Sequence, residues 1–501
     1  MDKAIQTYLF NPISTASDAN ENIWAHLKSR SSILIYAAIG CSIGLFALSF
    51  SIKITLGLLI LLILGFIGLI KPEIVAIVLG FLLPFHLEWE MPQLAGIKVG
   101  TTSLLVAVGF ISILLNRFLN RKTRLPRIPH IIPWSLLALF MCAAYIHSPY
   151  FSSDPAKIPW HLYRSVLRFL LIFPLIFVLL QTKSQLLSKN MIWMILVSTT
   201  IAGLGGIVQT TTGTPWHPFH YGINLESLLL YKDLFTAENV TGVLRAFGPF
   251  THPNGFAGYL VITIAISLGI LFCTPRNRLW HVTLVSLAVQ ITALLCTMSR
   301  GGWVAFSGST VLMGILAKKK KVIGMGAGIL ALAFILMPST QKSKIASRAK
   351  SISKPSQVEE FAFRQKRWDT FLEIAFKNPI LGTGMAVLDN PNEGEVGQTP
   401  HNMYLYFAVQ NGIPALILLV YFLGQLCYWG FVTFQRTQNH WYRAIALGGL
   451  GAGIGLFIHG AVDALIGLEQ IWTAFWVLFA MIIFVAEQNR GSTKIYPNVY
   501  Q

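Results

Sequence analysis

Long apolar runs separated by short polar breaks dominate the chain. A bilayer core about 30 Å thick needs about 20 apolar residues as helix, and helices satisfy their own backbone polar groups in lipid. Several neighbouring runs are separated by only two or three residues, so we predict 12–14 transmembrane helices. The fourteen runs lie near 31–50, 52–70, 73–86, 99–119, 131–147, 160–180, 190–212, 254–273, 279–298, 301–317, 322–337, 404–434, 444–462 and 470–487.

The composition excludes the other protein classes of this size. Of the 501 residues, 54% are hydrophobic and only 12% are charged, which is about half the charged fraction of a soluble domain. The polar surface is too small to shield this much apolar surface from water, which excludes a soluble enzyme, a disordered chain and a coiled coil. The predicted fold class is therefore an all-α polytopic membrane protein.

The distribution of positive charge predicts the orientation of the helices. The net charge of +18 comes from 38 Lys+Arg against 20 Asp+Glu, and on a soluble chain it would suggest nucleic acid. Here the cations follow the positive-inside rule, because they fall on alternate loops when the N-terminus is placed in the cytoplasm. We therefore expect two cytoplasmic termini and no nucleic-acid partner. The predicted inside loops carry Arg117, Arg121, Lys122, Arg124 and Arg127, then Lys183 and Lys189, Arg276 and Arg278, Lys318 to Lys321, and Arg436 with Arg443.

This orientation divides the chain into five parts. A cytoplasmic tail (1–30) precedes a transmembrane bundle (31–337) that includes an outer loop at 213–253. A large, helical outer loop lies between about 338 and 403, followed by the C-terminal transmembrane helices (404–487) and a cytoplasmic tail (488–501).

Arginines on the predicted outer side are the informative charges, because short outer loops normally avoid them. Arg164 and Arg168 are four residues apart and share one helix face. Arg245 precedes a loop that ends at a helix start, Arg300 occupies a tight turn, and Arg364 lies in the large outer loop. Several arginines with few nearby carboxylates favour an anionic ligand. The alternative is that each arginine contacts lipid head-group phosphates.

The large outer loop ends in a motif that predicts a general base. Thr399 is expected to cap a helix whose first residue is Pro400, which places His401 in the first turn of a transmembrane helix. A neutral imidazole at the membrane surface accepts a proton, as a general base must. A histidine that only forms local hydrogen bonds is the alternative.

A second pair of polar residues lies near the outer end of the penultimate run. His459 and Asp463 are four residues apart, so we expect them to contact each other on one helix face. Ionisable residues inside a membrane are often functional, and a structural hydrogen bond is the equal alternative. The five cysteines lie in apolar runs, and we predict no metal site and no cofactor.

Together these residues resemble the O-antigen ligase and polymerase superfamily over roughly 240–485. The similarity rests on separate motifs. One departure is Ala415, three residues after Gly412, where the family usually has Gly, Thr or Tyr. The motifs are Arg245 with Gly248 and Asn254, Ser299-Arg300-Gly301, Trp368 followed by Asn378-Pro379-Ile380-Leu381-Gly382-Thr383-Gly384, and His401-Asn402 with Gly412.

The resemblance implies a function for these residues. Members of the family join a glycan from a polyprenyl diphosphate carrier to lipid A core, to a growing polysaccharide or to another hydroxyl acceptor. His401 would then be the base of an inverting, metal-independent displacement, and Arg245 and Arg300 would stabilise the leaving diphosphate. We expect a multi-pass protein of the bacterial inner membrane, in contact with membrane lipids, with its active site facing the periplasm. The predicted substrate-binding residues are Arg164, Arg168, Asn254, Arg364, Asn402, His459 and Asp463.

Two other functions remain open. A second family in this superfamily, described as bicarbonate transporters, looks similar around Ser299-Arg300-Gly301-Gly302-Trp303 and around His459-Gly460-Ala461-Val462-Asp463. A transporter would have no need for the His401-Asn402 motif, so the enzyme is favoured. A structural membrane subunit would explain the hydrophobicity but not the outer arginines.

Overall fold

The structure is a computed structural model in which most of the chain is described. The chain divides into two units, 1–64 and 65–501, and all the described residues belong to the second. The predicted runs at 31–50 and 322–337 lie outside the described residues. The described residues are 66, 71–85, 88–91, 97–119, 126–148, 162, 166, 168–214, 244–318, 339–350, 359–384 and 399–493.

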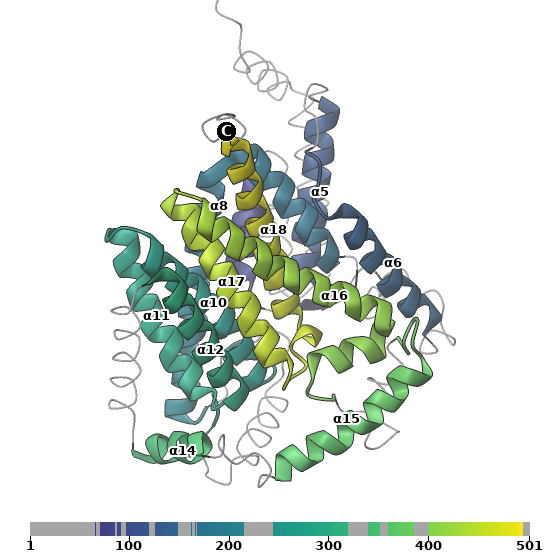
Figure 1. Cartoon of the computed structure of the whole chain (residues 1–501), viewed down its shortest axis with the longest axis vertical. Helices are drawn as coiled ribbons and strands as arrows, with labels where there is room; N and C mark the ends of the chain where they lie inside the picture. Colours follow the sequence, from purple (N-terminus) through teal and green to yellow (C-terminus); the bar gives the residue numbers. More distant parts are fainter. Residues whose placement is uncertain are drawn as a thin grey trace, which may run out of the picture. The chain divides into compact units, whose positions relative to one another are not determined.

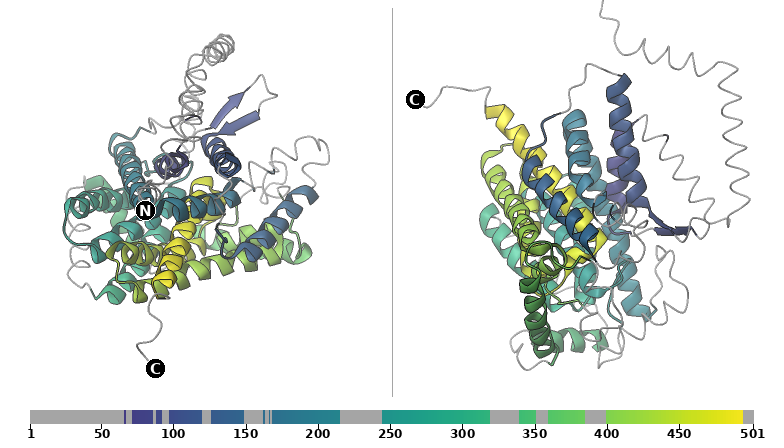
Figure 2. Two further views of the ribbon diagram at one scale, coloured as in Figure 1. Left: turned by 90° about the horizontal axis from the view of Figure 1, so that it is seen from above. Right: turned by 90° about the vertical axis from the view of Figure 1, so that its right-hand side faces the viewer.

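The prediction of an all-α polytopic membrane protein is confirmed. Six helices in the described residues are long and apolar enough to cross a membrane, and shorter apolar helices accompany them. The predicted total of 12–14 spans includes segments that the structure does not describe. The one sheet among the described residues is a small antiparallel hairpin of β1 (Glu88–Met91) and β2 (Ile97–Gly100), visible as paired arrows in Figure 2.

Helices in the first half differ from the prediction in two places. The run at 73–86 forms only the 11-residue helix α4 (Pro72–Leu82), about 16 Å long and too short to cross a bilayer by itself. The runs at 160–180 and 190–212 were expected to be separate spans with a loop at Lys183 and Lys189, but helix α8 (Arg168–Thr212) continues through both lysines. No glycine or proline interrupts 175–201, so nothing in the local sequence ends the helix there. Helices α5 (Thr101–Leu119) and α6 (Ile131–His147) follow the predicted runs closely.

The second half agrees better with the predicted spans. Helices α10 (Pro253–Cys273), α11 (Arg278–Cys296) and α12 (Arg300–Ala317) correspond to three successive runs. Further along the chain come α16 (Met403–Arg436), α17 (His440–Gly460) and α18 (Glu469–Thr493), labelled in Figure 1. The short 3₁₀ helix η7 (Leu465–Gly467) precedes α18.

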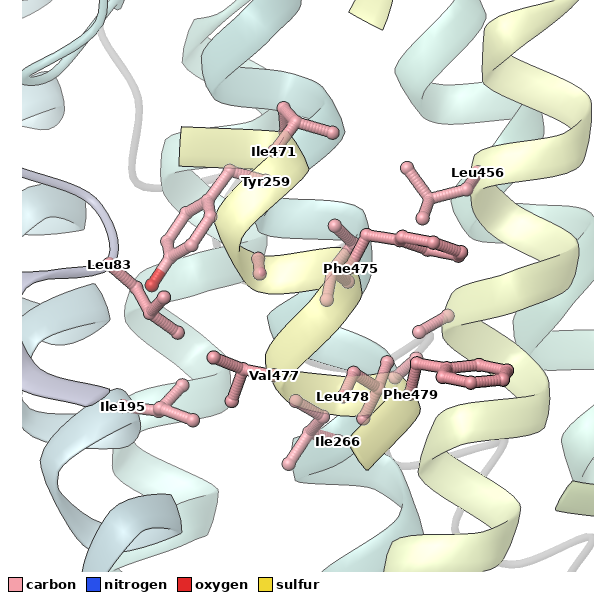
Figure 3. Packing of buried hydrophobic residues seen from close by; sticks show 14 of the residues in the cluster. Leu83, Ile195, Tyr259, Ile266, Leu456, Ile471, Phe475, Val477, Leu478 and Phe479 are labelled. Carbon is pink, nitrogen blue, oxygen red and sulfur yellow. The ribbon is translucent and has the colours of Figure 1, made fainter. Parts of the chain in front are cut away.

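Close packing of helices builds the centre of the bundle. Helix α10 is buried along its whole length and packs against α17, where Gly269 faces Ala444 O and Gly448 faces Ile266. Glycines at both helices let the two backbones approach, as in other membrane helix pairs. Aromatic and aliphatic side chains of α18 fill the adjoining core against α10 and α17 (Figure 3).

Two helices lie in the described residues of the outer loop at 338–403, which was expected to be helical. Helix α14 (Ser339–Lys350) is short and basic, and α15 (Glu359–Lys377) lies against α16. Phe371 and Ala375 of α15 form a small core with Leu405, Ala408 and Val409 of α16. This contact brings α15 to the end of the bundle at which α10, α12 and α16 begin.

Candidate functional site

A small polar cavity lies at this end of the bundle, where three helices begin and α17 ends. Its volume is about 40 Å³, measured at the centres of water-sized spheres, which is room for a few waters or one small polar group. Most of its lining comes from residues that the sequence singled out. The lining residues are Arg245, Asn254, Met298, Ser299, Arg300, Gly301, Arg364, His459, Val462 and Asp463.

Arg245 is held rigidly at the wall of the cavity. Its side chain is only 5% exposed. Its Nε donates a hydrogen bond to Thr297 O (2.9 Å), and its Nη2 donates to Asn254 Oδ1 (2.8 Å). Asn254 lies in the first turn of α10, so this contact joins the loop before the helix to the helix itself. The planar guanidinium is thereby oriented before any ligand binds.

Arg300 reaches the same cavity from the start of α12. The predicted tight turn is the first turn of this helix, with Ser299 as the N-cap whose Oγ accepts a hydrogen bond from Gly302 N (3.2 Å). Arg364 of α15 also lines the cavity, and its Nη1 donates to Val462 O (2.8 Å). Three arginines from separate segments of the chain therefore line one small space, which favours an anionic ligand.

His401 is paired with a carboxylate at the edge of this cavity. The His401 Nδ1 lies 3.6 Å from Asp463 Oδ1, and the two side chains are 27% and 14% exposed. The helix that follows begins later than predicted, because Asn402 and not Thr399 is its N-cap. Asn402 Oδ1 accepts hydrogen bonds from Tyr404 N and Leu405 N, both at 3.0 Å. His401 therefore precedes the helix, in a left-handed conformation with φ of 48°.

Asp463 interacts with three histidines, which are His401, His252 and His459. Burial, the largest single influence, raises the pKa of Asp463, whereas the nearby imidazole of His401 lowers it. The charges of His252 and His459 act in the same direction, so the pKa lies well below its ordinary value. Asp463 is thus a carboxylate at neutral pH.

His459 and Asp463 do not share one helix face as expected, because α17 ends at Gly460 and Asp463 lies beyond the helix. Both residues line the cavity and their charges interact, while the carboxylate also pairs with His401. His459 is 1% exposed, and its Nε2 lies 3.5 Å from Ser299 Oγ. The glycine after His459 and the following turn end the regular helix before the fourth position is reached.

Three side chains near the site had no role assigned to them from the sequence. His252 caps α10, its Nδ1 accepts a hydrogen bond from Asn254 N (3.1 Å), and burial is the main cause that lowers its pKa. On α15, Arg367 Nη1 donates to Thr399 O (3.2 Å) and Trp368 Nε1 donates to Pro400 O (2.8 Å). The helix-start pattern at 251–254 and the i, i+3, i+4 spacing from Arg364 were the available signals.

Three other residues predicted to bind substrate, Asn402, Arg164 and Arg168, do not line the cavity as the structure describes it. Asn402 caps α16 and its Nδ2 donates to Ala461 O (3.1 Å), so its described contacts are structural. Arg164 lies outside the described residues, and Arg168 is the first residue of α8, with a side chain that the structure does not describe. Substrate binding by these two arginines stays a prediction.

Comparison with known proteins gives a family for this part of the chain. Residues 282–420 match the family described as O-antigen ligase. The chain is also 28% identical over 198 residues to the O-antigen ligase of Salmonella typhimurium (strain LT2), an alignment that covers 36% of this chain. It spans about half (46%) of that relative's length. The family match includes Arg300, Arg364 and His401, whereas Arg245 and Asp463 lie outside it.

Proposed function

We propose that this chain, whose residues 282–420 match the O-antigen ligase family, transfers a glycan from a polyprenyl diphosphate carrier to an acceptor hydroxyl. The observation that carries the proposal is the cavity in which Arg245, Arg300 and Arg364 lie beside the His401–Asp463 pair. Cations for a leaving diphosphate and a base for an attacking hydroxyl are the two requirements of this reaction.

His401 is the general base in this mechanism. It accepts the proton of the acceptor hydroxyl while the acceptor oxygen attacks the anomeric carbon, and the bond from that carbon to the diphosphate oxygen breaks. Asp463 at 3.6 Å orients the imidazole and stabilises the imidazolium that forms. A single attack by the acceptor inverts the anomeric configuration. A general base contributes about 10²–10⁴ to the rate of such a step.

Arg245 and Arg300 bind the departing diphosphate. Their positions are fixed by the loop before α10 and by the first turn of α12, so they do not need to reorganise when negative charge develops. Arginines that neutralise the leaving group supply what a divalent cation supplies in other diphosphate reactions, and we therefore propose a reaction that needs no divalent metal.

The site faces the periplasm in this proposal. At the other end of the same helices, Arg276 lies between α10 and α11, Lys318 follows α12, and Arg436 and Arg443 flank the connection from α16 to α17. Cations collected at one end of a bundle indicate the cytoplasmic side. The opposite end, with the site, then faces the periplasm of a bacterial inner-membrane protein with a cytoplasmic C-terminus.

The acceptor belongs to one of three chemical kinds: lipid A core, a growing polysaccharide, or another hydroxyl. The Salmonella relative is an O-antigen ligase by name, which favours the lipid A core and a role in lipopolysaccharide synthesis. Bicarbonate transport is disfavoured because the cavity lies at one end of the bundle, whereas secondary transporters bind near the bilayer midplane.

A comparison of two histidine variants tests the proposal. We expect cells with His401→Ala to accumulate polyprenyl diphosphate-linked glycan and to lose the joined product. The matched control is His440→Ala, which removes an exposed histidine at the start of α17 on the far end of the bundle. Both variants are compared at equal membrane levels. An unchanged glycan profile in His401→Ala would reject His401 as the base, and bicarbonate uptake that survives this change would favour the transporter.

A further inference from the structure

We infer that the turn at 378–384 is a positioning element. It holds the short helix 403–411, the first part of α16 just after His401, in the place that catalysis requires. The inference rests on the proposed function, because it assigns the turn a role through His401. The sequence analysis named this turn, Asn378-Pro379-Ile380-Leu381-Gly382-Thr383-Gly384, as one motif of the resemblance and assigned it no role.

Helix α16 is broken, and the break creates a docking place for backbone. Gly412 has φ of 85° and ψ of 166°, which no helix contains, so 403–411 and 413–436 are two helices that meet at this residue. The break removes the helical hydrogen bond from Ile413 N to Val409 O. In a continuous helix Gln410 O would accept a hydrogen bond from the N–H of residue 414, but Pro414 has no N–H to donate.

The turn supplies the missing partners. Thr383 N donates a hydrogen bond to Val409 O (2.8 Å), and Gly384 N donates to Gln410 O (3.0 Å). In return, Ile413 N donates to Pro379 O (2.8 Å). These bonds pair the polar backbone groups that the break exposes, so the break and the turn stabilise each other.

Glycine is required on both sides of this contact. Gly382 has φ of 67°, and a Cβ there would lie 2.5 Å from Val409 O. A Cβ on Gly412 would overlap Ile380 O and the following peptide. Side chains are therefore excluded by the close approach of two backbones and by the left-handed conformations.

The other end of the short helix is tied to the same outer segment. Trp368 Nε1 and Arg367 Nη1 of α15 hold Pro400 O and Thr399 O, immediately before His401. Between the two ends, Phe371 packs against the buried face of the short helix. The segment at 399–412 is thus fixed at both ends and along one side, which sets the distance from His401 to Asp463.

Gly412→Ala tests this role, with Gly424→Ala as the matched control. Gly424 lies in the same helix, and a Cβ there meets nothing within 4 Å. The assay uses the lipid-linked glycan that accumulates in cells lacking the protein, with purified variants in lipid vesicles. The amount of donor bound at saturation gives the number of folded sites, and the transfer rate is divided by that number. A displacement of about 1 Å costs about 10²-fold in rate, so we expect a fall of about 10–100-fold for Gly412→Ala and none for Gly424→Ala.

The reference variant His401→Ala separates the two hypotheses. If His401→Ala transfers normally, the proposed function fails. If it is inactive while Gly412→Ala keeps its full rate per bound donor, only the positioning role fails. A loss of donor binding in parallel with transfer would mean that Gly412 serves folding alone and would also overturn the inference. If Gly412→Ala does not accumulate, Gly382→Ala decides, because its Cβ would meet Val409 O and displace the turn itself; an unchanged rate per bound donor would refute the role.

Discussion

Replacing Asp463 by asparagine removes one charge at the site and keeps the shape of the side chain. Asp463 Oδ1 lies 3.6 Å from His401 Nδ1, and the carboxylate is ionised because its pKa is lowered below the ordinary value. In the proposed mechanism His401 accepts the proton of the acceptor, and an imidazolium forms next to this carboxylate. Asp463→Asn therefore removes a stabilising interaction that is strongest in the transition state.

The size of the effect follows from the distance and the exposure of the pair. Two unit charges 3.6 Å apart attract each other by about 5 kcal/mol at an effective dielectric constant of ~20. The side chains are 27% and 14% exposed, so solvent screens part of this attraction. With roughly half retained, about 2–3 kcal/mol is lost, which corresponds to a fall of about 10²-fold in kcat at 1.36 kcal/mol for each factor of ten.

A double-variant cycle measures whether Asp463 acts through His401. Transfer is followed for Asp463→Asn, for His401→Ala and for the double variant in lipid vesicles at equal protein. If the carboxylate acts through the imidazole, the double variant is no slower than His401→Ala. A further fall of about 10²-fold in the double variant would show an independent role, and full activity of Asp463→Asn would refute the reasoning.

Three further changes have defined outcomes. Gly269→Ala places a methyl group against Ala444 O, so we expect a loss of about 1–3 kcal/mol in stability, measured by unfolding in detergent; equal stability would contradict the packing. Arg245→Lys keeps the charge but loses the hydrogen bond to Asn254 Oδ1, and transfer should fall by about 10-fold or more; a fully active variant would mean that charge alone suffices. Burial lowers the pKa of His252 below its ordinary 6.5. The neutral imidazole therefore stabilises the fold fully above about pH 6.5, and this stability is lost as the pH falls toward the lowered pKa. His252→Asn keeps a capping acceptor, so acid should destabilise it less than the wild type between pH 7 and 5.

The sequence predicted the parts of the site that local patterns specify. The loop after Arg245 was expected to end at a helix start, where α10 begins at Pro253, and the tight turn expected at Arg300 is the first turn of α12. The apolar runs gave the spans α10, α11 and α17 to within a few residues, because a bilayer demands their length and composition. The convergence of Arg245 and Arg300 was expected from their common side of the membrane.

Other features depend on contacts that no local pattern contains. The start of α16 was misplaced because Thr399-Pro400 is a good helix start, whereas Asn402 caps the helix and Thr399 O and Pro400 O are held by α15. The break at Gly412 is stable only with the turn at 378–384 docked against it. Backbone hydrogen bonds between segments distant in sequence leave no periodic signal.

The balance of charge at the cavity connects the geometry to the donor. Arg245, Arg300 and Arg364 carry three positive charges, and the carboxylate of Asp463 offsets one of them. The remaining charge of two equals that of a diphosphate esterified at both ends, as in a carrier-linked glycan. In the proposed reaction the bond to the sugar breaks and the leaving diphosphate gains a further negative charge beside these arginines, of which Arg245 and Arg364 are held by hydrogen bonds. A site of this kind therefore stabilises the transition state more than the bound donor, which is the condition for a higher rate.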